Sequence, residues 1–167
     1  FGGLNYIEFN SNGSVSVNAP SGGAAYNIGG CTLHRTLGIN LHYPWKELGE
    51  DAKQRLQQTL KRLLVLIVDE RSQLSSCVTG AAERTIRQCA FAGHNQNQPW
   101  GGIPVILLVG DDFQLPPVRA EGAIIGFARK NEKTAYNNTS AGGKQLLIEE
   151  GQIQLTEVLT EHVFELT

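Results

Sequence analysis

Two short, uninterrupted apolar runs stand out along the chain. The first covers residues 63–68 and the second residues 103–109, and both are rich in branched side chains. Runs of this length and composition are typical of strands that are buried on both faces of a parallel sheet. Residues 14–18 alternate between polar and apolar side chains, which predicts a further strand.

Helical signals lie between these strands. Residues 49–62 place leucines on or near one stripe among lysine, glutamine and arginine. Helices are predicted at 24–28, 49–62, 77–91 and 142–150. Ser75 and Ser76 are candidate caps of the third, whose inner face is predicted to hold Val78, Ala81, Ala82, Thr85, Ile86 and Cys89. Short strands are predicted at 153–155 and 163–166, whereas residues 31–45 show no firm period. Strands therefore alternate with helices, which predicts an α/β fold.

Composition narrows the class of protein. The 14 basic and 16 acidic residues give a net charge of −2, which excludes a domain held to nucleic acid by bulk charge but not a local DNA groove. The 3 cysteines form no Cys-x-x-Cys pair, so we expect no disulfide framework or zinc site and a reducing intracellular setting. The longest aliphatic run, residues 63–68, is far shorter than the roughly 20 residues that cross a bilayer, so no membrane-spanning helix is predicted. The 167 residues begin with Phe1 and include no methionine, so we expect a piece of a longer chain or a processed product.

Both apolar runs end in acidic residues. Asp69 and Glu70 follow the first run, and Asp111 follows the second. Ligands of open α/β sheets bind at the carboxyl ends of the strands, and an acidic pair there is costly to bury without a cation or a partner. This is the Walker B arrangement, in which Asp69 holds Mg²⁺ beside nucleotide phosphates and Glu70 polarises a water. The alternative is that the carboxylates cap the next helix.

A glutamine follows the second run on a stiff loop. Gln114 precedes Leu115, Pro116 and Pro117, and a glutamine held on such a loop can contact a γ-phosphate and report its loss. A proline-stiffened turn is the alternative, but it accounts only for the prolines and not for the nearby carboxylates.

Three segments resemble motifs of one family, in that family's order. Residues 109–118, preceded by Trp100-Gly101-Gly102, resemble motif III of the Pif-type DNA helicases, which belong to superfamily one and are relatives of RecD. Residues 66–72 resemble their motif II, and residues 19–25 resemble their motif Ia. The resemblance implies a RecA-like P-loop NTPase fold, a mostly parallel sheet with helices on both faces. Residues 1–167 would form part of the first motor domain, incomplete at the N-terminus.

The resemblance also implies an activity and the residues that perform it. It implies an ATP-dependent DNA helicase that uses ATP and Mg²⁺ to move 5′ to 3′ on single-stranded DNA and to unwind duplexes in replication, repair, recombination and telomere maintenance. Asp69 would bind Mg²⁺ and Glu70 would activate the attacking water. Gln114 would couple the γ-phosphate to strand movement, with Asp111 supporting the motif.

DNA contacts are implied for a second group of residues. Pro20, Ser21 and Gly22 would lie along single-stranded DNA, and His34 would touch its backbone; a histidine satisfied by its own loop is the equal alternative. The expected partners are single-stranded DNA and duplex junctions, with no membrane. The expected location is inside the cell, in the nucleus, with the mitochondrion as the alternative.

The chain departs from the family pattern at three positions. Gly23 stands where motif Ia usually has lysine, and Arg71 and Gln73 stand where the family favours small apolar residues. These departures give some support to one alternative, a degenerate, non-catalytic module. A second alternative, the helicase part of a mobile element, is a variant of the helicase hypothesis and also stays open.

A phosphate-binding loop of the form Gly-x-x-x-x-Gly-Lys-Ser/Thr is missing from the sequence. Gly143-Lys144 does not qualify, because Asn138 stands at the first glycine and Gln145 at the hydroxyl position. We expect the true loop to precede residue 1, and the 167-residue chain alone to neither hydrolyse ATP nor unwind DNA.

Overall fold

A parallel sheet forms the centre of the molecule. The computed structural model describes residues 13–40, 42, 44, 46–90, 96–111, 114 and 141–155, so the strand predicted at 163–166 lies outside the described residues. The 4 strands have the order β2-β1-β3-β4 and are all parallel. They are β1 (Val15–Ala19), β2 (Cys31–Thr32), β3 (Val65–Val68) and β4 (Val105–Leu108). The predicted strands at 14–18, 63–68 and 103–109 are therefore confirmed.

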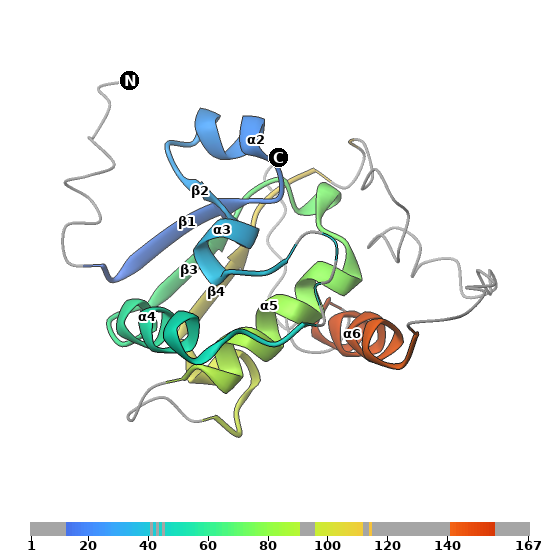
Figure 1. Ribbon diagram of the computed structural model, residues 1–167. Coiled ribbons are helices and arrows are strands. Elements are labelled where there is room, and N and C mark those ends of the chain that lie inside the picture. The colour runs from blue at the N-terminus through green and yellow to red at the C-terminus, as the bar shows by residue number, and fades with distance from the viewer. Residues whose placement is uncertain are drawn as a thin grey trace.

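Helices lie between these strands, and one more follows β4 (Figure 1). They are α2 (Gly22–Asn27), α3 (Leu33–Leu37), α4 (Glu50–Leu60), α5 (Ser76–Gln88) and α6 (Ala141–Ile153), with 3-10 turns at Arg71–Gln73 and Pro99–Gly102. All four predicted helices are confirmed, and α3 is the addition. It escaped prediction because its 5 residues are too few to show a period. Within the described segments, no helix is long and apolar enough to cross a membrane.

The main core lies between one face of the sheet and helices α3, α4 and α5. Leu66 and Val68 of β3 are fully buried there, together with leucines of α3 and α4 and the inner face of α5. On the other face, Val105 and Leu107 of β4 remain 39% and 44% exposed. The described helices thus cover one face of the sheet, and helices on the second face stay a prediction.

Helix α6 lies against α5 as a further layer (Figure 1). Two glycines form the crossing: a Cβ on Gly80 would overlap the carbonyl oxygen of Leu147, and one on Gly151 would overlap that of Ser76. An ion pair also joins the two helices, with 2.8 Å between Arg84 Nη2 of α5 and Glu150 Oε2 of α6. The strand predicted at 153–155 is wrong. Helical structure continues through these residues, because the buried positions Leu147, Ile148, Gly151 and Leu155 recur at helical spacing, and Leu147 and Gly151 lie against α5.

Candidate functional site

The carboxyl ends of three strands meet at one edge of the sheet. Val68 of β3 pairs with Asn18 of β1 on one side and with Leu108 of β4 on the other. The residues that follow these strands therefore emerge side by side, and α2 lies beside this edge (Figure 1). The fold thus brings the segment after Ala19, the Asp69–Glu70 pair and the segment leading to Asp111 to the same edge, where α/β sheets bind their ligands.

The acidic pair occupies a sharp turn at the end of β3. The backbone N–H of Asp69 still donates to the Asn18 carbonyl oxygen, at 2.8 Å, as if the strand continued. Glu70 then turns the chain, with φ 54° and ψ 48°, a left-handed conformation that few non-glycine residues adopt. Its Oε2 atom is buried and has no hydrogen-bond partner among the described residues. The turn therefore holds a carboxylate oxygen at the strand end that is ready to accept a water or a cation.

Helix capping, the alternative for this pair, does not match the geometry. Glu70 makes no side-chain bond to the 3-10 turn that follows it. Helix α5 begins later, and its cap is Ser75, whose Oγ accepts from the Val78 N–H at 3.3 Å. Ser75 was one of the two caps expected from the sequence, and it leaves the carboxylates without a capping role at α5.

Backbone contacts join this turn directly to the segment after β4. The Arg71 N–H donates to the Val109 carbonyl oxygen at 2.9 Å. Gly110 lies so close that a Cβ on it would stand 2.6 Å from the Arg71 nitrogen, so only glycine fits. Beyond it, the Gln114 N–H donates to the Asp111 carbonyl oxygen at 3.2 Å, and both residues are exposed. The two loops are therefore in direct contact through their main chains.

The residues predicted to contact DNA lie at the end of β1 and on α3. Ser21 is exposed and caps α2, because its Oγ accepts from the Ala24 N–H at 3.3 Å. A Cβ on Gly22 or Gly23 would meet nothing within 4 Å, so the backbone there is open to a partner. His34 is half-buried on α3; its Nδ1 is buried and finds no partner in the described part of the chain, and burial lowers the pKa of its imidazole. The alternative was a histidine whose ring is hydrogen-bonded within its own loop, and Nδ1 makes no such bond to the described residues.

The acidic residues suit a cation that needs few protein ligands. Among the residues that the structure describes, no three His, Cys, Asp or Glu side chains gather into a metal site. Mg²⁺ differs from zinc or calcium in this respect, since it binds through one or two carboxylates and takes its other ligands from water and phosphate. The single carboxylate of Asp69 meets that requirement and leaves the buried Glu70 oxygen for a water.

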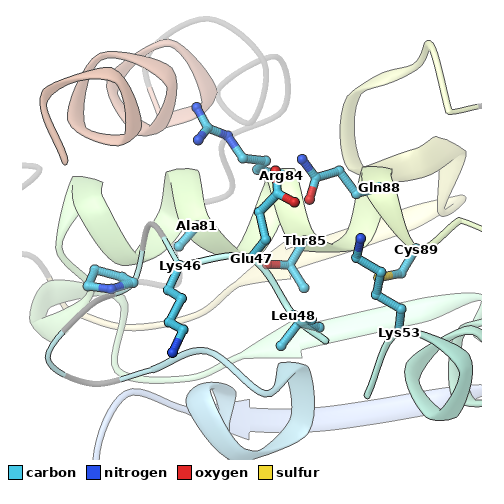
Figure 2. A pocket seen from close by; sticks show the side chains of 10 residues that line it. Lys46, Glu47, Leu48, Lys53, Ala81, Arg84, Thr85, Gln88 and Cys89 are labelled. Atoms are coloured by element: carbon cyan, nitrogen blue, oxygen red, sulfur yellow. The ribbon is translucent and has the colours of Figure 1, made fainter. Parts of the chain in front are cut away.

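A small surface pocket lies elsewhere, between α5 and the segment 46–48 (Figure 2). Lys46, Lys53 and Arg84 line it together with the buried Cys89. Its volume of ≈ 10 Å³ holds about one water, whereas small-molecule sites need roughly 300 Å³ or more. None of its lining residues is a site candidate, so it does not compete with the strand ends as the functional site.

Sequence reasoning missed two residues that shape the site. Gly110 sets the approach of the two loops, and Asn18 is a fully buried polar residue of β1. Asn18 could have been noticed in the sequence, because asparagine is disfavoured in strands and it ends the predicted strand 14–18.

Comparison with known proteins agrees with this geometry. The family model of PIF1-like helicases matches residues 5–131. The ATP-dependent DNA helicase PIF1 of Emericella nidulans is 36% identical over 132 residues, which are 75% of this chain and 17% of that protein. The chain thus spans about a sixth of the length of this relative.

Solved structures give the same result. The structure of Bacteroides sp Pif1 in complex with ADP-AlF4 has a TM-score of 0.55 and 30% identity, and covers 77% of this chain and 29% of that one. The Pif1 helicase from Bacteroides in complex with ADP-AlF3 and ssDNA has a TM-score of 0.54 and 31% identity, with 70% of this chain and 26% of that one covered. The predicted fold class, a mostly parallel sheet of the RecA-like helicase type, is confirmed. On its motifs, its fold and its family match, the chain belongs to the PIF1-like helicase family.

Proposed function

We propose that residues 1–167 are part of the first motor domain of an ATP-dependent DNA helicase. One observation carries the proposal: the Asp69–Glu70 turn and the loop that leads to Gln114 meet at one sheet edge and are joined by the bond from Arg71 N–H to Val109 oxygen. A motor needs this arrangement, because hydrolysis at one loop must move another.

The nucleotide lies at this edge. Asp69 would hold Mg²⁺, and the bound ion would neutralise the phosphate charge. The buried Glu70 oxygen takes the proton of the attacking water. Gln114 contacts the γ-phosphate, and Asp111 fixes the loop through its carbonyl bond to the Gln114 N–H. The support is geometric together with the family match, whose Bacteroides relative binds ADP-AlF4.

Single-stranded DNA lies beside α2 and α3. Pro20, Ser21 and Gly22 offer an open backbone, and His34 contacts a phosphate. Few basic side chains are required, which agrees with the net charge of −2. The Bacteroides Pif1 bound to ssDNA supports this choice of substrate. The helicase moves 5′ to 3′, engages duplex junctions and maintains DNA in replication, repair, recombination and at telomeres, in the nucleus or the mitochondrion.

Glu70→Gln in the full-length protein that carries this chain tests the proposal. The substitution keeps the shape of the side chain but removes the base, so we expect ATP turnover to fall about 10²- to 10⁴-fold while nucleotide binding persists. The measurements are phosphate release and the affinity for a fluorescent ATP analogue, each with and without oligo(dT).

Glu149→Gln is the matched control, because it makes the same change on the exposed surface of α6. Its turnover should equal that of the wild type. Equal turnover in Glu70→Gln and the wild type would contradict the assignment of Glu70.

A further inference from the structure

The polar residue Asn18 stands where a strand of this kind normally carries an apolar side chain. It is 0% exposed, in the middle of the sheet between β2 and β3. Asparagine is disfavoured in strands, and a buried amide is costly unless its donors and acceptor are bonded. A buried apolar residue would fill the site without that requirement, so the bonds of Asn18 call for an explanation.

The Asn18 side chain bonds to its own strand, to β3 and to α3. Its Nδ2 donates to Ser16 Oγ at 2.9 Å and towards the Ile67 carbonyl oxygen at 3.4 Å. Its Oδ1 accepts from Thr36 Oγ1 at 2.6 Å. Its own carbonyl oxygen accepts from the Asp69 N–H at 2.8 Å. The amide is thus fully bonded, and it bridges β1, β3 and α3.

The three elements that it bridges carry the proposed nucleotide site and the proposed DNA contacts. Asp69 is the first residue after β3. Pro20 is the first residue after β1 and lies two positions beyond Asn18. Thr36 lies on α3 two residues beyond His34. Two bonds thus connect the nucleotide end to the helix that carries His34: the Asp69 N–H bonds the Asn18 main chain, and the Asn18 side chain bonds Thr36. Chains of hydrogen bonds in a buried site couple their members more strongly than exposed ones do.

We propose that Asn18 is a positioning residue that couples DNA contact at motif Ia and α3 to the Asp69 site. The inference rests on the proposed function and adds a residue to it. Asn18 touches neither nucleotide nor DNA; it acts through Asp69 on one side and through Thr36 on the other.

Thr36→Val in the full-length protein separates coupling from structure. The substitution keeps the shape of the side chain and removes only the hydroxyl that bonds Asn18 Oδ1. We expect turnover without DNA and the KM for ATP to stay within about twofold, while stimulation by oligo(dT) falls about 3- to 30-fold, the range of substitutions within coupling networks. Thr36→Ser restores the hydroxyl and should restore the stimulation.

Two further variants complete the design. Thr79→Val is the control, because the Thr79 hydroxyl also makes one intramolecular hydrogen bond, to the Ser75 carbonyl oxygen at 3.0 Å, on α5. Thr79 is 0% exposed, whereas Thr36 is only partly buried, so the control removes a bond that is at least as well shielded. It should lower the melting temperature without changing the stimulation ratio. Asn18→Val combined with Thr36→Val should lose no more stimulation than Asn18→Val alone, since Asn18→Val already removes the bond to the Thr36 hydroxyl.

The outcomes are distinct. A wild type whose turnover does not respond to oligo(dT) contradicts the proposed function and this inference together. A stimulated wild type in which Thr36→Val behaves like Thr79→Val overturns the inference alone. If Asn18→Val does not fold, Thr36→Val and Thr36→Ser decide the question without it.

Discussion

Glu70 is the residue with the most informative backbone in the molecule. A side chain in the left-handed region costs about 1–2 kcal/mol, which glycine avoids. The strain at Glu70 persists because its turn is fixed on both sides, by the Asp69 bond to β1 and by the Arg71 bond to Val109. Strain held at a site in this way agrees with a role for the carboxylate in chemistry and not in stability.

The first residue-scale prediction compares glycine with alanine at this position. We expect Glu70→Gly to be more stable than Glu70→Ala by about 1 kcal/mol, because glycine relieves the left-handed strain. Thermal denaturation of the two variants measures the difference. Asp69 is the control: its φ is not positive, so Asp69→Gly should be less stable than Asp69→Ala. An alanine variant at 70 that is as stable as the glycine variant contradicts the prediction.

The second residue-scale prediction concerns His34 and pH. Burial lowers the pKa of His34 from 6.5, so the unfolded chain binds this proton more readily than the folded one. Its contribution to stability is therefore complete above the unfolded value and is lost as the pH falls through the lowered folded value. We expect the wild type to lose more stability between pH 7.5 and pH 5.5 than His34→Gln, measured as urea midpoints. His42→Gln, which replaces an exposed histidine, is the control. It should lose as much stability between the two pH values as the wild type does.

At the scale of elements, the crossing of α5 and α6 depends on the absence of two side chains. Gly80 and Gly151 allow the helix backbones to touch, and a methyl group on either would overlap a carbonyl oxygen of the partner helix. Glycine is otherwise a poor helix residue, so its presence in both helices is explained by packing and not by propensity.

Gly80→Ala and Gly151→Ala test this crossing. We expect each to destabilise the chain by about 1–3 kcal/mol, since overpacking outweighs the gain in helix propensity. Gly23→Ala is the matched control, because a Cβ there meets nothing within 4 Å on α2. It should stabilise by about 0.5–1 kcal/mol. Chemical denaturation measures all three, and equal signs at Gly80 and Gly23 would contradict the packing argument.

For the whole molecule, the sequence holds only some of the parts that the proposed nucleotide site requires. The strand ends provide carboxylates and a glutamine, but the sequence has no Gly-x-x-x-x-Gly-Lys-Ser/Thr loop to bind phosphates through its N–H groups. We therefore expect the purified 167-residue chain to show no ATP turnover with or without oligo(dT), as measured by phosphate release. A turnover that Glu70→Gln abolishes would overturn this expectation.

Much of this protein could be predicted from its sequence alone. The strands at 63–68 and 103–109, the helix capped by Ser75 and the carboxylates at the strand ends all rest on local patterns, which depend on neighbouring residues in the chain. The motifs at 19–25, 66–72 and 109–118 were also sufficient to indicate the family, which the comparison with known helicases confirms.

Only the tertiary structure decided how these parts combine. The order β2-β1-β3-β4, the left-handed turn at Glu70 and the bonds of Asn18 depend on residues far apart in the chain, which no local period encodes. The same holds for residues 153–155, whose apolar alternation suggested a strand. In the structure this segment is helical, with Gly151 packed on α5 and Leu155 buried. Sequence patterns determine which secondary structure each segment prefers, whereas non-local contacts determine where its side chains lie. The reason is that burial and hydrogen bonding between distant residues outweigh weak local preferences.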